Sequence, residues 1–569
     1  MVRRTWRPAT VLMAAVVALA TVAGCAAVPT EGPVRRGDVV LDDPGLPIPQ
    51  GDDPVPDDTP EGIVSGFLRA GAAGLSDDFS VARKFLTPAA SSAWDPRARV
   101  IVYPGQSGGP EIEERVDGSV LVTVPVEAKI DASYRYTEVK AGAREEIVLE
   151  LTRDATDQWR ISHLDDGVVM SPSNFDILYR RVPLYFATRD LEQLVPDVRW
   201  FPNVNTATYA VAALLDGPSP WLRDSVRTGV PEGARLDAAA AVTVSPELEA
   251  QVDLSTNADI AGNGDINLLQ VQLEATLQRL SGVTSVSVSV GQVPWVPQSV
   301  LRLQRDVMPV GGPYVLADDR LAIMDGGEAV PVEDAAPLTG IDARDPAVSL
   351  DERTRVVLDG QTQLLLLPEG GAAPVALMTG SRLVAPSVDR FGWVWSGEQV
   401  STGELKAVQP SGEVVAVTAG ILNGRTVRSL RVSRDGSRIA IVHGDASERD
   451  VSVDVVAVIR DDAGRPQLLG ELPLQIGATL DDATEVAWVD EATVAVLGST
   501  GQATGPTMHL VPVGGPTEAL PFLVGARGIA AGRGDRALFL ADAENVLLAL
   551  QSRSWVRVSD GVRDPVFPG

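Results

Sequence analysis

The feature that most restricts the fold of this chain is a short pattern that recurs throughout its C-terminal part. Six times, an apolar, strand-like segment runs into a turn rich in Asp, Gly and Arg. The segments are Val315–Ile323, Val348–Arg353, Ser387–Trp395, Val432–Ala440, Ala487–Ala495 and Ala530–Phe539. They lie about 32 to 55 residues apart, close to the roughly 40 to 50 residues of one propeller blade. We therefore predict an all-β propeller of about five to seven blades over residues 299–569, with unrelated β-sandwich repeats as the alternative.

The first 25 residues have the parts of an export signal. Three arginines lie within the first seven residues, and the apolar run Ala9–Val22 follows them. This run is too short to span a bilayer and has the length of a signal-peptide core. Small residues before a lone cysteine match a lipobox, so we predict that residues 1–24 are removed by cleavage between Gly24 and Cys25. The alternative is an ordinary cleaved signal followed by a chance cysteine.

Cys25 is then the predicted site of lipidation. Its thiolate would take an S-diacylglycerol group, and its freed amine an N-acyl group. One acyl chain alone anchors a protein only marginally, whereas two or three hold it firmly. We therefore predict a lipoprotein anchored in the cell membrane, with the rest of the chain on the extracytoplasmic face.

The chain is strongly acidic, with 48 Lys and Arg against 76 Asp and Glu and a formal net charge of −28. Removal of residues 1–24 takes away three arginines and lowers this charge to −31. Such a protein is repelled by nucleic acids and by anionic lipid head groups. We therefore predict no nucleic-acid partner, and membrane attachment through the lipid rather than through a basic patch.

Residues 25–58 are predicted to be an acidic tether, because they contain seven prolines and almost no apolar periodicity. Residues 59–180 are predicted to form an α+β domain. Thr59-Pro60-Glu61 is typical of a helix start, and a second helix is expected over residues 78–86, stopping at Thr87-Pro88. Strand-like segments follow the two helices. This order resembles that of NTF2-like domains.

Residues 181–298 alternate between strand-like and helical segments. Helices are predicted at Thr206–Leu215 and at Ile266–Leu280, where leucines recur on one face. Four spaced elements of this segment resemble the GerMN domain first described in spore-germination and sporulation proteins. They are Leu214-Leu215-x-Gly217-Pro218, Val230-Pro231-x-Gly233, Val252-Asp253-Leu254-Ser255 and Gln272-Leu273-x-x-Thr276-Leu277. A generic α/β domain is the alternative.

No group of residues in the sequence predicts catalysis or cofactor binding. The three histidines, His163, His443 and His509, have no metal-ligand spacing. Gly105–Pro110 contains G-x-S-x-G, but no histidine precedes its serine and Gly-Gly-Pro blocks a following helix. Gly532–Ala537 fits a loose dinucleotide fingerprint, yet a strand-like segment follows it. We therefore predict no catalytic, metal or cofactor-binding residues.

The order of lipobox, acidic tether, NTF2-like unit, GerMN-like unit and propeller resembles the LpqB family of actinobacterial lipoproteins over essentially the whole mature chain. The resemblance implies a non-enzymatic accessory of the MtrA–MtrB two-component system. Its expected partner is the extracytoplasmic domain of the MtrB sensor histidine kinase, and its expected role is in cell-envelope homeostasis and division. The family's motifs are structural, so the resemblance assigns no interface residues.

Two other functions remain open on the sequence. The first is a cell-wall-binding protein that holds peptidoglycan or another glycan through the GerMN-like unit and the propeller. The second is an enzyme, such as a lyase, on one face of the propeller. No nucleophile, metal-ligand or cofactor pattern favours the second.

Overall fold

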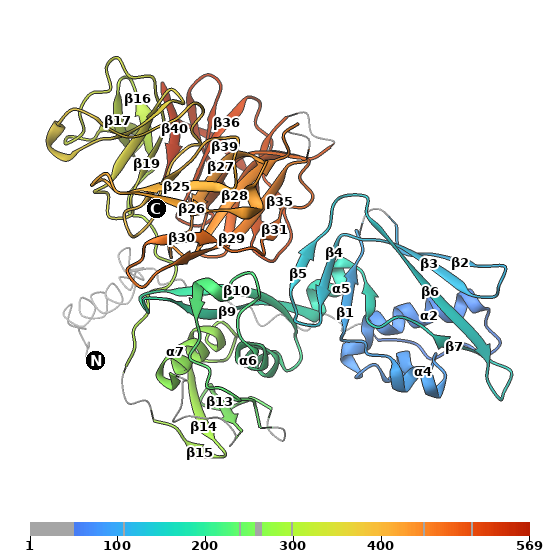
Figure 1. Ribbon diagram of the computed structural model, residues 1–569. Coiled ribbons are helices and arrows are strands. Elements are labelled where there is room, and N and C mark those ends of the chain that lie inside the picture. The colour runs from blue at the N-terminus through green and yellow to red at the C-terminus, as the bar shows by residue number, and fades with distance from the viewer. Residues whose placement is uncertain are drawn as a thin grey trace, which may run out of the picture. The chain divides into compact units, whose positions relative to one another are not determined.

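The computed structural model describes residues 50–105, 108–237, 241–255, 265–296, 300–447, 450–501 and 505–569. These residues form a multidomain chain in which α/β regions precede an all-β region (Figure 1). The fold class predicted from the sequence is therefore confirmed. The predicted domain boundaries stay predictions, and the signal peptide with most of the tether lies outside the described residues.

Three helices of the first region begin in the same way. α2 (Pro60–Ala73), α4 (Pro88–Ala93) and α5 (Pro172–Leu178) each start with a proline that follows a Ser or Thr. The hydroxyl of that residue accepts a hydrogen bond from a backbone N–H of the first turn, which would otherwise lack a partner. The helix start predicted at Thr59 is confirmed.

The helix predicted over residues 78–86 is wrong in length. Only the single turn α3 (Ser80–Arg83) forms, after Phe79 in a left-handed conformation with φ of 61°. Thr87, which was expected to stop this helix, instead caps the start of α4. A Thr-Pro pair ends one helix and begins another with equal ease, so its direction could not be read from the sequence.

Two four-stranded sheets complete the first region. One has the order β5 (Tyr136–Glu138), β4 (Ala128–Asp131), β1 (Arg99–Val102) and β8 (Val168–Met170). The other has the order β2 (Glu111–Glu114), β3 (Val120–Pro125), β6 (Arg144–Arg153) and β7 (Trp159–His163). Their buried residues and the apolar face of α2, including Ile63 and Phe67, form one core.

The second region has two sheets, one of three strands and one of four. One consists of β10 (Leu194–Pro202), β9 (Tyr179–Thr188) and β11 (Val226–Arg227). The other consists of β12 (Thr243–Val244), β13 (Glu249–Leu254), β14 (Ser285–Val290) and β15 (Val293–Pro294). The helices are α6 (Thr206–Asp216) and α7 (Ile266–Leu277). β13 and β14 pair in parallel with α7 between them, which is a βαβ crossover.

Side chains of α7 tie it to the hairpin of β9 and β10. The leucines predicted on one helical face are buried, and the fully buried Gln272 donates a hydrogen bond of 2.7 Å from Nε2 to the Tyr185 carbonyl in β9. Its Oε1 accepts a 2.7 Å bond from the backbone N–H of Gly229. Both ends of this buried amide are therefore paired, as burial requires.

From residue 300 onward the described strands form six units of four main strands. The first unit has β16 (Tyr314–Ala317), β17 (Arg320–Asp325) and β18 (Glu328–Pro331) with β40 (Val562–Val566). The second has β19 (Ala343–Val348), β20 (Arg355–Asp359), β21 (Gln363–Leu366) and β22 (Val375–Thr379). The third has β23 (Ser387–Val388), β24 (Val394–Ser396), β25 (Glu404–Val408) and β26 (Val414–Thr418). The fourth unit has β27 (Thr426–Val432), β28 (Arg438–Gly444), β29 (Ser452–Arg460) and β30 (Pro466–Leu469), with β31 (Leu474–Ile476) also paired to β29. The fifth has β32 (Asp482–Trp488), β33 (Thr493–Ser499), β34 (Thr507–Pro512) and β35 (Glu518–Ala519). The sixth has β36 (Ala526–Ala531), β37 (Leu538–Asp542), β38 (Val546–Gln551) and β39 (Ser554–Asp560).

Each segment of the recurring sequence pattern becomes a hairpin between two neighbouring strands of one unit. In the first unit this hairpin is β16–β17, and β40 takes the place that the first strand has in the other units, because β40 contacts both β36 and β19. The predicted Asp435-Gly436 turn is one of them, with Gly436 at φ of 74°. The first strands of successive units contact one another around the ring, and β36 contacts β40. Because β40 pairs with β16, the C-terminal strand completes the first unit and closes the propeller.

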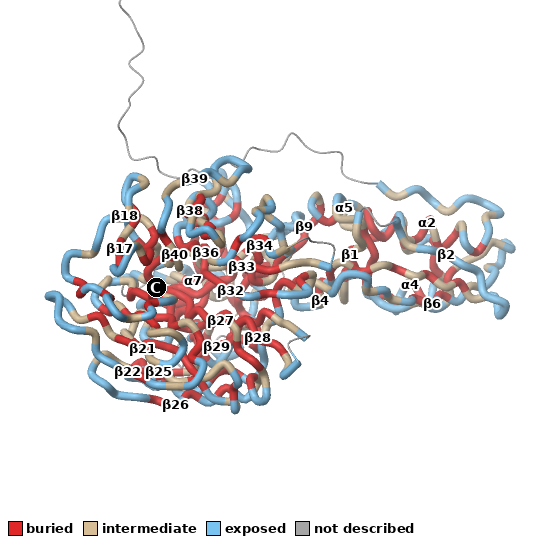
Figure 2. The backbone as a smooth tube through the Cα atoms, turned by 90° about the horizontal axis from the view of Figure 1, so that it is seen from above, coloured by how far each residue is buried: buried red, intermediate tan, exposed pale blue. Residues whose placement is uncertain are grey.

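Burial follows this architecture. Figure 2 shows buried residues concentrated along the strands, with exposed residues mostly in the turns between them. One apolar core runs from the second region into the fourth and fifth units of the propeller, for example from Phe186 to Val442 and Val511. The propeller therefore shares apolar contacts with the region that precedes it.

We expect a fragment that starts at Leu301 to fold on its own as an all-β protein, since β40 and β16 close the ring within that fragment. Far-UV circular dichroism would show a strand spectrum, and strong helical minima would contradict the expectation. A matched fragment that ends at Gly561 lacks β40. It should unfold at a clearly lower temperature, because its first unit has lost a strand.

Candidate functional site

The predicted lipidation and cleavage residues, Cys25 and Gly24, lie outside the described residues and stay predictions. In the part of the chain that the structure describes, no helix has the length and apolar character needed to cross a membrane. No three His, Cys, Asp or Glu side chains of that part are grouped so that they could hold a metal ion.

The three histidines lie in strands. His163 ends β7, whereas His443 in β28 and His509 in β34 are buried. The Nδ1 atom of His443 accepts a hydrogen bond from Arg425 at 3.1 Å, and its Nε2 contacts the Asp454 carboxylate at 2.7 Å. This ring is therefore held between two structural partners. Gly532–Ala537 forms the turn between β36 and β37.

A cluster of polar contacts lies where the β9–β10 hairpin meets the propeller, a region that we call the joint. Arg390, in the first turn of the third unit, reaches the loop of this hairpin. Its guanidinium forms ion pairs with Asp190 and, at 2.9 Å, with Glu192, and its Nε donates to the Asp435 carbonyl at 2.8 Å. Only 9% of the Arg390 side chain is exposed. Its partners are more accessible, with 31% of the Asp190 side chain and 69% of the Glu192 side chain exposed, so the pair with Asp190 is the better shielded of the two.

The wall of the joint on the propeller side is built around Phe391. The guanidinium carbons of Arg390 and Arg460 lie 4.2 Å and 4.5 Å from the centre of its ring. Arg460 is fixed by Asp389 at 2.6 Å and by the carbonyls of two glycines. One of them, Gly464, has φ of 77°, and a Cβ at this position would lie 2.6 Å from the Phe391 ring. The wall therefore requires glycine there.

A second set of contacts joins Tyr185 of β9 to the fifth unit. The Tyr185 hydroxyl donates a 2.5 Å hydrogen bond to Glu491 Oε1, and the Arg305 guanidinium lies over the Tyr185 ring at 5.3 Å. The backbone N–H of Glu491 donates to Asp306 at 3.2 Å. Glu491 therefore contacts both the hairpin, through Tyr185, and the segment leading into the propeller, through Asp306. Arg305 of the same segment lies over the Tyr185 ring.

The other end of the hairpin joins the propeller as well. The indole N–H of Trp200 in β10 donates to the Gly514 carbonyl at 2.8 Å. In the first region, the Glu138 carboxylate accepts hydrogen bonds from the backbone N–H and hydroxyl of Thr517, at 2.9 Å and 2.7 Å. The hairpin therefore contacts the propeller near both of its ends, beside a direct contact from the first region.

Under the joint lies a fully buried cation. Arg438 in β28 has no exposed side-chain surface, and its Nη2 donates to the Asp435 carboxylate and to the Glu491 carbonyl. Its guanidinium carbon lies 4.9 Å from the centre of the Trp488 ring. Burial alone would raise the pKa of Asp435, but the Arg438 charge and hydrogen bonds from Ser437 and Ser433 hold that pKa below its usual value. The pair supports the turn that Arg390 contacts.

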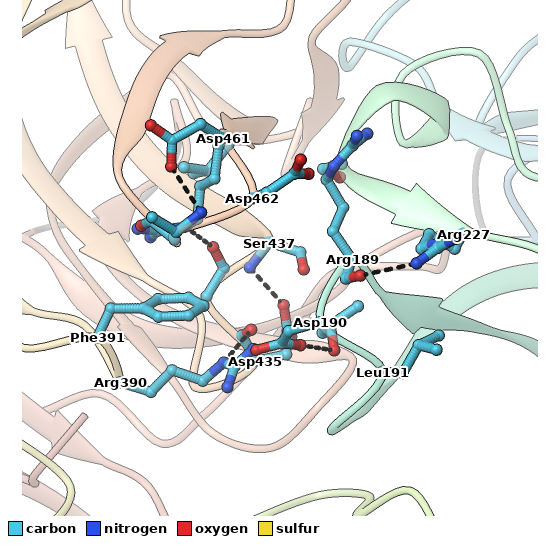
Figure 3. A pocket seen from close by; sticks show the side chains of 17 residues that line it. Arg189, Asp190, Leu191, Arg227, Arg390, Phe391, Asp435, Ser437, Asp461 and Asp462 are labelled. Carbon is cyan, nitrogen blue, oxygen red and sulfur yellow. Dashed lines mark hydrogen bonds and ion pairs between the residues drawn. The ribbon is translucent and has the colours of Figure 1, made fainter. Parts of the chain in front are cut away.

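An open pocket of about 760 Å³ lies at the joint (Figure 3). Hairpin residues and the strand β11 supply one wall, with Arg189 and Arg227. The β29–β30 turn of the propeller supplies the opposite wall, with Asp461 and Asp462. The Phe391 cluster forms part of the lining between them. This volume is in the range of pockets that bind small molecules.

A separate acidic group in the propeller comprises Asp345 of β19, Glu485 of β32 and Asp564 of β40, whose carboxylates influence one another. Burial raises the pKa of Glu485 to about 8, and the Arg431 charge lowers it only in part. Burial and the neighbouring Asp564 raise the pKa of Asp345 to about 6. Glu485 keeps 23% of its side chain exposed. These side chains belong to the ring itself and do not reach the pocket lining.

The sequence did not predict the joint. It singled out Ser387–Trp395 as one of the recurring turns, and this segment contains Arg390 and Phe391. Arg390 lies about two hundred residues from Asp190 and Glu192 in the sequence. No periodicity in a single chain marks such a pair.

Three family models match consecutive parts of the chain. Residues 53–176 match the N-terminal domain of lipoprotein LpqB, and residues 319–568 match the LpqB beta-propeller domain. Residues 183–294 match the Germane model, described as sporulation and spore germination. The resemblance of this middle segment to GerMN domains is therefore confirmed.

Curated relatives match over nearly the full length of the chain. Lipoprotein LpqB of Streptomyces coelicolor is 30% identical, and the match covers 99% of this chain and 98% of that protein. Lipoprotein LpqB of Thermobifida fusca is 27% identical, covering 96% and 97%. That of Cutibacterium acnes is 26% identical, covering 98% and 99%. With these domains in this order, and with a relative of this identity and coverage, the chain belongs to the LpqB family of lipoproteins.

Proposed function

We propose that this lipoprotein is a non-enzymatic accessory that binds the extracytoplasmic domain of the MtrB sensor kinase. Through this contact it modulates the MtrA–MtrB two-component system and thereby affects cell-envelope homeostasis and division. The observation that carries the proposal is the joint. Its ion pairs and hydrogen bonds connect the β9–β10 hairpin to two units of the propeller. Such a joint suits a protein that acts through the arrangement of its surfaces.

The mode of action follows from the joint and the lipid anchor. A kinase that contacts both the propeller and the region before it would respond to any change in their arrangement, without chemistry on the lipoprotein. Anchoring on the extracytoplasmic face of the membrane that holds the kinase confines both partners to one surface. This confinement raises their effective concentration, so modest intrinsic affinity suffices.

The net charge of the chain predicts how the rate of kinase binding depends on salt concentration. The mature chain has a net charge of −31 once the three arginines of residues 1–24 are removed, so its partner should present a basic patch. We expect the soluble mature chain, with Cys25 replaced, to bind the isolated extracytoplasmic kinase domain, with an association rate that falls about tenfold or more as salt rises. Surface plasmon resonance over a salt series measures this. An absence of binding at every salt concentration would contradict the proposal.

A pull-down of the lipidated protein from membranes provides an independent test. Recovery of the sensor kinase supports the proposal, whereas recovery of wall fragments alone would replace it with the wall-binding function. Arg390→Gln removes the ion pairs to Asp190 and Glu192 and should change kinase output. Arg353→Gln is the matched control, because 81% of the Arg353 side chain is exposed, and it should leave kinase output unchanged.

A further inference from the structure

The hairpin side of the joint pocket presents two arginines that no acidic side chain neutralises. Arg227 Nη1 donates to the Arg189 carbonyl at 3.3 Å, and Arg189 Nη1 donates to the Asp224 carbonyl at 3.4 Å. Among the described residues, neither guanidinium forms an ion pair with a carboxylate. Acidic residues exceed basic ones by 28 in this chain. Two arginines in one pocket lining whose guanidinium groups have no carboxylate partner among the described residues are therefore notable here.

The propeller side of the pocket presents the opposite charge. Asp461 accepts hydrogen bonds of 3.0 Å from the backbone N–H groups of Ala463 and Arg465, and one from the Gln467 side chain at 3.1 Å. Asp462 is exposed and accepts no hydrogen bond from the residues that the structure describes. Neither carboxylate forms an ion pair within the described part of the chain. Figure 3 shows Asp462 and Arg189 extending from opposite sides toward the same space.

The charged groups between these walls are already paired. Arg390 is matched by Asp190 and Glu192, Arg460 by Asp389, and Asp435 by the buried Arg438. The electrostatic character that the pocket offers to a ligand is therefore set by its two walls. One wall is cationic and the other is anionic, across a space of about 760 Å³.

We propose that this pocket binds a short peptide with free termini. The peptide carboxylate is held by the Arg189 and Arg227 guanidinium groups, whose geometry suits bidentate hydrogen bonding to a carboxylate. Its terminal ammonium is held by Asp461 and Asp462. A polyanion such as a nucleotide would meet the two aspartates, and a neutral sugar would leave both walls without counter-charges. A zwitterion satisfies both walls at once.

Peptide binding would also act on the joint. The cationic wall belongs to the hairpin region and the anionic wall to the propeller, so a peptide that contacts both bridges them. A ligand that binds only the assembled joint stabilises it by mass action. This proposal does not depend on the kinase, because peptide binding is measured on the lipoprotein alone.

Calorimetric titration of the full mature chain, with Cys25 replaced by Ser, tests the proposal. The probes are unblocked alanine peptides from dialanine to penta-alanine, together with N-acetylated, C-amidated and doubly blocked forms of each. At least one unblocked length should bind, and blocking either terminus should weaken its binding about tenfold. If no unblocked peptide binds, or if the doubly blocked peptide binds as tightly as the unblocked one, the proposal is wrong.

Each pocket variant, tested with blocked and unblocked peptides, shows which wall of the pocket holds which peptide terminus. Asp462→Asn should weaken binding of the unblocked peptide about tenfold but leave binding of the N-acetylated peptide unchanged. Arg227→Gln should weaken binding of the unblocked peptide about tenfold but leave binding of the C-amidated peptide unchanged. Equal losses for blocked and unblocked peptides would overturn the assignment. Asp325→Asn and Arg353→Gln, at exposed positions outside the pocket, are the matched controls and should bind like the parent chain.

Discussion

Arg438→Met is expected to destabilise the protein by about 3 to 5 kcal/mol at neutral pH, the cost of breaking a buried ion pair from one side. Arg438 is fully buried, and Asp435 keeps only 7% of its side chain exposed. Removal of the guanidinium therefore leaves a buried carboxylate without its counter-charge, and the carbonyl of Glu491 loses a donor. Chemical denaturation followed by tryptophan fluorescence measures the change, because Trp488 lies beside the pair.

Two further variants separate charge from general disruption. Arg353→Met removes an arginine of which 81% is exposed and should change stability by less than about 0.5 kcal/mol. The double variant Arg438→Met, Asp435→Asn removes both charges and should regain part of the loss. If Arg438→Met is as stable as Arg353→Met, the buried pair does not support the joint.

The pH dependence of this difference has a defined sign. In the parent chain the pKa of Asp435 is held low, so its stabilising contribution is present above its ordinary value of 3.8 and is lost as pH falls through the lowered pKa. In Arg438→Met, burial without a counter-charge raises that pKa, so protonation relieves the cost as pH falls. The difference in stability should therefore be largest at neutral pH and should shrink toward pH 4. A difference that grows on acidification would contradict this assignment.

Cys25→Ala is expected to remove the protein from the membrane or to leave it as an uncleaved precursor. The acyl chains on Cys25 are the proposed anchor, and each buried CH₂ contributes about 0.8 kcal/mol to membrane binding. The acidic mature chain offers no electrostatic substitute, because anionic head groups repel it. Fractionation of cells, with immunoblotting of the mature and precursor forms, measures the distribution. A processed Cys25→Ala protein found wholly in the membrane fraction would refute the anchor.

Local sequence patterns predicted the parts of the fold that local physics determines. Thr59 caps a helix through its own hydroxyl, the leucines of α7 recur at helical spacing, and Asp435-Gly436 supplies the positive φ that its hairpin requires. The recurring turns predicted a propeller because each unit repeats the same hairpin. In each case the information lies within a few residues.

The parts that were missed depend on contacts between distant segments. β10 (Leu194–Pro202) contains Asp197 and Arg199, which obscure its strand character, yet both are buried as an ion pair of 2.8 Å. Ser219, from beyond α6, completes this pair with two hydrogen bonds to Asp197. The joint pocket is similar, since its two walls come from residues more than two hundred positions apart. Pairing of this kind has no local signature.

We propose that this anchored lipoprotein modulates a sensor kinase in the same membrane. The most direct test is the phosphorylation of the MtrA response regulator in cells that carry either the anchored protein or a released form. The released form has an ordinary export signal and no Cys25, and both forms are compared at matched abundance. We expect the anchored form to restore normal phosphorylation and the released form to fail, because it loses the concentration that a shared membrane provides. Equal phosphorylation with both forms would show that anchoring beside the kinase plays no part.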